Sequence, residues 1–188
     1  SEQAIKDRLE FDIFGNNNIF EITGTAISPI RYGMNSPIYY IFTEDSNVLY
    51  MSDGDEVVLN AYYGDDEKVI IPDNINGMKV TALGGYVFNG KPIKEVVLPE
   101  TITVIGNRAF RKCTELKSVV VPSSVETIIE GAFQQSAITS ITIPENVTSI
   151  GKTALGACSD LEKIEIKAKS ITIANYCARA CANLKQVY

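Results

Sequence analysis

The chain has 188 residues, a formal net charge of −6, 45% hydrophobic and 21% charged residues, which is typical of a folded globular protein and excludes wholesale disorder. It contains no histidine, which excludes Ser-His-Asp and Cys-His catalysis and every metal site with a histidine ligand. A sequence pI of about 4.8 argues against nucleic acid as a partner, and no run of about 18 apolar residues is present that could span a membrane.

Residues 1–64 show no internal repeat and are predicted to form a β-rich N-terminal region. Residues 2–14 carry apolar side chains at four-residue spacing, which favours an amphipathic helix, although a strand that begins near Phe11 is the alternative. Short apolar runs separated by turn formers are typical of strands and lie at 19–27, 38–42, 48–51 and 57–63. Because the chain that follows is repetitive, and a stack of repeats leaves an apolar end, we interpret this region as a cap.

An acidic run lies between residues 44 and 67, where eight acidic residues occur without a lysine or arginine. Its carboxylates cluster at 53–56 and 65–67, and carboxylate oxygens are ligands that calcium prefers. Their spacing does not match a calcium-binding loop, and runs of charge are usually solvated. We therefore predict no metal site and no cofactor.

Residues 94–184 repeat one pattern four times, with units that begin at Lys94, Lys117, Thr139 and Glu162. The period of 23, 22 and 23 residues indicates a leucine-rich-repeat solenoid, with one strand-plus-turn unit in each coil. Residues 67–93 carry the same pattern with extra residues around Asn76-Gly77, which predicts a longer first coil. The sequence therefore predicts a solenoid of about five coils over residues 65–188.

Each repeat is predicted to begin with a short strand that places two apolar side chains inside and one outside, as in residues 96–98 before Pro99. A second extended segment follows, and Gly106 and Gly151 come after it, where we expect a turn that a Cβ would hinder. A short helical turn then supplies a small and a large inward side chain, as in Ala109-Phe110. The predicted fold class is thus an α+β repeat, a solenoid with a strand and a short helical turn in each coil and a β-rich N-terminal cap.

The last repeat departs from the pattern. Lys167 replaces the proline, Ala178 replaces the phenylalanine, and residues 185–188 restart the strand motif. Either this strand closes the solenoid or the chain was cut from a longer array.

The pattern Leu116-x-x-Val119-x-Val121-Pro122, followed by Val125-x-x-Ile128 and Ala132-Phe133, resembles the bacterial BspA-like leucine-rich repeats. The motif V-x-x-I-G-x-x-A-[FL]-x-x-C between Val147 and Cys158 is similar to the same family. The resemblance covers residues 57–188. It implies a non-enzymatic bacterial protein, extracellular or on the cell surface, that binds host proteins or other cells.

The cysteines follow the repeat as well. Cys113, Cys158 and Cys181 share one repeat position, which Ser136 takes in the coil between the first two, and Cys177 takes an alanine position. The spacing of Cys177 and Cys181, without any histidine, does not make a zinc site. A disulfide between Cys158 and Cys181 is sterically feasible because they stack in adjacent coils, while small buried free thiols are the simpler interpretation.

The outward strand positions form the candidate ligand-binding surface. At about 4.8 Å per coil, their side chains make a stripe that is apolar over three consecutive coils. The stripe comprises Ile70, Val97, Val120, Thr142 and Glu165. The alternatives are that the N-terminal region covers the stripe, or that its apolar residues only reflect β propensity.

These patterns predict a protein-binding or adhesion module without catalytic residues, which uses the strand face and the loops and has a host or cell-surface protein as its partner. The alternative function is a structural spacer or self-assembling repeat of a larger surface protein. The end of the solenoid is the surface through which we expect such self-association.

Overall fold

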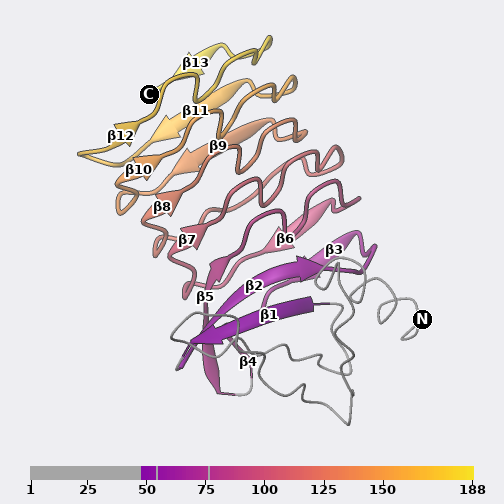
Figure 1. The fold of residues 1–188 in the computed structure, drawn as a ribbon. Helices are drawn as coiled ribbons and strands as arrows, with labels where there is room; N and C mark the ends of the chain where they lie inside the picture. Colours follow the sequence, from indigo (N-terminus) through magenta and orange to yellow (C-terminus); the bar gives the residue numbers. More distant parts are fainter. Residues whose placement is uncertain (1–47, 54, 76) are drawn as a thin grey trace, which may run out of the picture.

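The computed structural model of the chain describes residues 48–53, 55–75 and 77–188. These residues wind into an elongated stack of coils, with β1 (Val48–Asp53) and β2 (Glu56–Tyr62) at one end and β12 (Thr172–Ile173) and β13 (Gln186–Val187) at the other (Figure 1). The solenoid predicted from the repeat period is confirmed. The elements predicted for residues 2–14, 19–27 and 38–42 lie outside the described residues.

One sheet runs along the whole stack, in the order β1-β2-β5-β7-β8-β10-β12, with β4 paired to β5. β1 and β2 form an antiparallel hairpin, and every neighbour along the path from β2 onward is parallel. The remaining strands are β4 (Asn74–Ile75), β5 (Met78–Leu83), β7 (Val104–Ile105), β8 (Thr127–Ile128) and β10 (Ser149–Ile150). Because β2 pairs directly with β5, the hairpin continues the sheet of the solenoid.

The opposite wall of the solenoid consists of short parallel strands in register. β3 (Lys68–Ile70) pairs with β6 (Glu95–Val97), and β11 (Lys163–Ile166) lies between β9 (Ser140–Ile143) and β13. Residues 118–121, in the coil between β6 and β9, are described but form no strand, so the wall is interrupted there. The predicted alternation is present even in this coil, since Val119 and Val121 are buried and Val120 is exposed.

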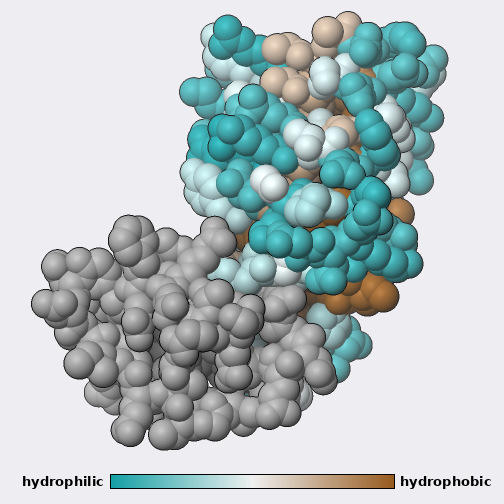
Figure 2. All heavy atoms as spheres, turned by 90° about the vertical axis from the view of Figure 1, so that its right-hand side faces the viewer, coloured by the Kyte–Doolittle hydropathy of each residue, from teal (hydrophilic) through white to brown (hydrophobic). Residues whose placement is uncertain are grey.

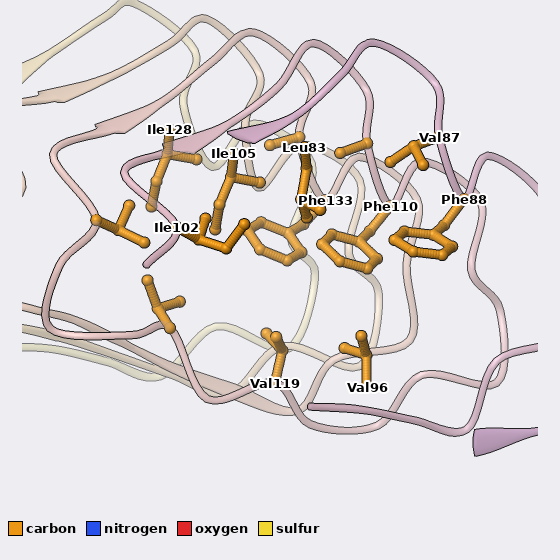
Figure 3. Close-up of a cluster of buried hydrophobic side chains, with 14 of the residues drawn as sticks. Leu83, Val87, Phe88, Val96, Ile102, Ile105, Phe110, Val119, Ile128 and Phe133 are labelled. Carbon is orange, nitrogen blue, oxygen red and sulfur yellow. The ribbon is translucent and has the colours of Figure 1, made fainter. Parts of the chain in front are cut away.

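The interior is a set of columns in which one residue type stacks on itself (Figure 3). Phe88, Phe110 and Phe133 are fully buried and stack with ring centroids 5.2 and 5.3 Å apart and planes within 12° and 5° of parallel. Tyr62 extends this row at 5.3 Å from Phe88, so the aromatic row begins in β2. Val96 and Val119 face the phenylalanines from the opposite wall (Figure 3). The inward assignment of the phenylalanine position is therefore confirmed.

The predicted short helical turns are wrong, because the described residues contain no helix. In the corner turn of one coil, the N–H groups of Phe110 and Lys112 donate to carbonyls of the next coil at 2.7 and 2.9 Å, while the N–H of Arg111 donates only to Arg108, three residues back. Arg108 and Lys112 also adopt positive φ angles of 53° and 58°. A helix needs consecutive N–H groups directed along its own axis, and here every second one is directed to the neighbouring coil. The segment is thus a series of tight turns.

The described residues also contain no helix that is long and apolar enough to cross a membrane.

The glycines that follow the second extended segment are required for a different reason than the one predicted. Gly106 and Gly151 do not have positive φ angles; instead the preceding coil passes very close to them. A Cβ on Gly106 would collide with the carbonyl oxygen of Leu83, and one on Gly151 would collide with the backbone of Ile129 and Glu130. The glycines therefore set how closely the coils approach.

Replacing Phe110 by alanine should lower the free energy of unfolding by about 3–5 kcal/mol, because it removes the centre of the aromatic row and leaves a cavity. Urea denaturation followed by circular dichroism measures this loss. A loss below about 1 kcal/mol would contradict the packing of the row.

Replacing Gly106 by alanine should destabilise the chain by about 1–3 kcal/mol, because the new methyl group overlaps a backbone that cannot move without separating two coils. Gly85→Ala is the matched control, since a Cβ there meets its nearest atom, the Asn107 carbonyl oxygen, at an ordinary 3.5 Å. Equal losses of stability for the two variants in the same denaturation assay would rule out the close approach as the cause.

Candidate binding surface

The five predicted site residues lie in one column on the outer side of the wall that contains β3, β6, β9 and β11. Ile70 is directly beside Val97 in the β3–β6 pair, and Thr142 is beside Glu165 in the β9–β11 pair. Ile70, Val97 and Val120 expose 65%, 42% and 80% of their surface, and Thr142 and Glu165 are half-buried. We call this column the outer stripe; its three apolar side chains are exposed.

The outer stripe is most exposed where the wall is interrupted. Among the described residues, no backbone group of 118–121 is hydrogen-bonded to another backbone group. Val120 projects from this segment, between the buried side chains of Val119 and Val121. The centre of the stripe is thus an exposed apolar side chain on a segment that has no backbone pairing with its neighbours.

Paired charges border the outer stripe. Lys68 and Glu95 form an ion pair of 2.8 Å two residues before Ile70 and Val97, and Lys163 at the border pairs with Glu165 of the stripe itself at 3.6 Å. All four side chains are partly exposed, so these pairs contribute little to stability. They do neutralise the border of the stripe, which favours a partner with an apolar, weakly charged surface over a polyanion.

The outer face of the long sheet is different. Its outward positions are taken by small or polar residues, and Val104 is the largest of them: Ala82, Val104, Thr127, Ser149 and Thr172. The face drawn in Figure 2 is also largely hydrophilic over the described residues, with hydrophobic atoms in small groups. The outer stripe is therefore more apolar than the outer face of the long sheet.

The described part of the acidic run holds carboxylates that already have partners. Asp65 pairs with Lys91 at 3.2 Å, Glu67 with Lys94 at 2.6 Å, and Asp66 accepts a hydrogen bond from the phenol of Tyr62. Burial, followed by that hydrogen bond, raises the pKa of Tyr62 well above its usual value. Within the described ranges, no group of three ligating side chains has the arrangement of a metal site. The contact between Tyr62 and Asp66 was not predicted; its only sequence signal is an aromatic residue one coil ahead of Phe88.

The cysteine column is present as predicted, and the four thiols are free in the structure. Cys113 and Cys158 are fully buried and donate to the carbonyl oxygens of Phe88 and Phe133 at 3.1 and 3.0 Å. Cys181 makes the equivalent bond to Leu155 at 3.0 Å but is only half-buried. These thiols line the interior of the solenoid and lie apart from the outer stripe.

Comparison with known proteins identifies the repeat. Residues 81–188 match the model of the BspA type leucine rich repeat region, in six copies. No curated protein matches the sequence closely enough to count as a relative.

Several solved structures are similar to the chain. A leucine-rich repeat protein of T. pallidum, TpLRR, superimposes with a TM-score of 0.72 at 25% identity, over 77% of this chain and 70% of TpLRR. The pneumococcal vaccine antigen PcpA has a TM-score of 0.64 at 25% identity, over 74% of this chain and 34% of PcpA. A leucine-rich repeat protein of Bacteroides ovatus, at 21% identity and a TM-score of 0.55 over 79% of this chain and 53% of that protein, shares the fold. PcpA and the Bacteroides protein thus contain much chain that has no counterpart here.

Proposed function

Because the chain belongs to the family of BspA-type leucine-rich repeat proteins, we propose that it is a non-enzymatic protein-binding or adhesion module, displayed on or secreted from a bacterial cell. The observation that carries this proposal is the outer stripe, where Ile70, Val97 and Val120 are exposed on successive coils of one wall. The absence of histidine supports a non-enzymatic role. The similarity to PcpA, a vaccine antigen, supports a location at the cell surface.

The size of the outer stripe indicates how a partner would be held. Full burial of a valine or isoleucine contributes about 1.5–3 kcal/mol, so the three apolar side chains supply on the order of 5–9 kcal/mol at most. Association costs roughly 4–15 kcal/mol in lost translational and rotational entropy. The stripe alone therefore gives weak binding, and the partner gains the rest of its affinity from the neighbouring loops.

The partner that fits this surface is a protein with an apolar, weakly charged ridge. Paired charges at the border neither attract nor repel a strongly charged ligand, and the chain carries no tryptophan, the residue best suited to stacking on sugars. A host or cell-surface protein meets these requirements better than a glycan or a nucleic acid.

Replacing both Val97 and Val120 by lysine should abolish binding to a protein partner, at least a tenfold loss of signal on an array of host and bacterial surface proteins, because two charges would have to be desolvated at the contact. The double variant Val104→Lys/Thr127→Lys places the same charges on the long sheet and serves as the control. Both variants should retain the wild-type melting temperature. Unchanged binding by the Val97/Val120 variant, or an equal loss in the control, would refute the role of the outer stripe.

A second candidate function, self-assembly, is favoured by the last coil. It exposes apolar and aromatic side chains at the end of the stack, at Ile173, Tyr176, Val187 and Tyr188. A second copy that stacks on this coil would cover these side chains.

Light scattering during gel filtration tests the second candidate. Self-assembly predicts that the wild-type chain becomes dimeric as its concentration rises, and that Val187→Asp/Tyr188→Asp remains monomeric because the end becomes charged. Ile70→Asp, on the outer stripe, is the control and should dimerise like the wild type. A monomer at every concentration would exclude assembly through the last coil and leave binding as the function.

A further inference from the structure

The cysteine column contains one pair of thiols at the same position of two adjacent coils. Cys158 and Cys181 take the same position in adjacent coils, and each thiol donates a hydrogen bond of 3.0 Å to a backbone carbonyl of the preceding coil, Cys158 to Phe133 and Cys181 to Leu155. Cys113 has no such neighbour, because Ser136 takes the position between it and Cys158; the Ser136 hydroxyl lies 3.6 Å from the Cys158 sulfur. Adjacent coils lie about 4.8 Å apart, which falls within the Cα–Cα range of about 4.4–6.8 Å that a disulfide requires.

The two thiols of this pair differ in accessibility. Cys158 is completely buried, whereas Cys181 is half-exposed in the last coil. The neighbouring Cys158 thiol lowers the pKa of the Cys181 thiol, while the neighbouring Cys181 thiol and burial raise the pKa of Cys158. The pair thus combines a reachable sulfur that ionises first with a protected sulfur beside it, the arrangement of an attacking and a resolving cysteine.

We propose that Cys158 and Cys181 are a redox-sensitive pair that closes to a disulfide on reaction with a small-molecule disulfide, and so ties the last coil to the preceding one. This inference is independent of the outer stripe, since it concerns the inner lining at the end of the solenoid.

The chemistry is thiol–disulfide exchange in two steps. The Cys181 thiolate attacks one sulfur of the small disulfide, the sulfur–sulfur bond breaks, and one small thiolate leaves and takes up a proton. Cys158 then loses its proton and attacks the Cys181 sulfur of the mixed disulfide, and the second small thiolate leaves. The protein pair is oxidised by two electrons, and one small disulfide is reduced to two thiols.

The bond would act where the coils are least well packed. In the last coil Ala178 takes the position of the phenylalanines, and the hydrogen bonds from Leu155 to Cys177 and from Ala157 to Arg179, at 2.9 and 2.7 Å, hold the corner to its neighbour. A covalent link at Cys181, two residues beyond Arg179, prevents this corner from separating when those bonds open. We expect amide exchange in residues 172–188 to slow at least tenfold after oxidation.

The test incubates the full chain with glutathione disulfide under native conditions, traps the remaining thiols by alkylation, and maps the peptides by mass spectrometry. The wild type should lose two alkylatable thiols and yield a peptide pair joined through Cys158 and Cys181. Cys158→Ser, which introduces the residue found at position 136, should stop at a glutathione adduct on Cys181. Cys113→Ser and Cys177→Ser should behave like the wild type.

Three results would overturn the proposal. They are four free thiols in the wild type after this treatment, a bridge between Cys177 and Cys181, and a glutathione adduct on Cys177 in place of Cys181. Hydrogen exchange provides a separate readout: unchanged exchange in residues 172–188 of a chain shown to be bridged would refute the locking of the last coil. Circular dichroism of each variant checks that the fold is retained.

Discussion

The close and regular approach of the coils is the constraint on which the structure depends. The corner turns donate hydrogen bonds to the next coil, as Phe110 does to Ala132, whereas the long sheet donates in the opposite direction, as Ile129 does to Ile105. Each coil is therefore held to both neighbours by backbone bonds with a fixed register. A fixed register forces each inward side chain to lie on its equivalent in the next coil, so the chain must repeat the same residue types to fill the interior.

The same constraint explains why the outer surface is free to vary. The register is set by backbone hydrogen bonds and does not depend on the outward side chains. The outer stripe accordingly changes from isoleucine and valine at Ile70 and Val97 to threonine and glutamate at Thr142 and Glu165. A repeat scaffold with a uniform interior can thus carry a surface of any chemistry, and the apolar half of the stripe needs a reason other than packing.

The inward columns could be predicted from the sequence because a period of about 23 residues reports them directly. The corner turns could not, because their hydrogen bonds lead to residues about 22 positions away, and a local alanine-phenylalanine pattern carries no sign of that. Gly106 was recognised, but its role depends on the distance to Leu83 and not on its own backbone angles. For the outer stripe, exposure follows from strand alternation, whereas the interruption at residues 118–121 has no signal in the sequence: the serine and valines there fit a strand well. The identity of a partner depends on the surface of a second molecule, so it could not be predicted from this sequence.

The packing of the interior also sets the chemistry of its thiols. Along the phenylalanine position the side chains become smaller, from Phe133 to Leu155 and then to Ala178, and burial decreases with them. Beside Phe110, Cys113 is sealed in the core, and burial raises its pKa to about 12, so it is inert. Beside Ala178, Cys181 is half-exposed and ionises more readily. A bond between Cys181 and Cys158 would therefore add a covalent link to the coil in which alanine takes the place of the large aromatic side chain.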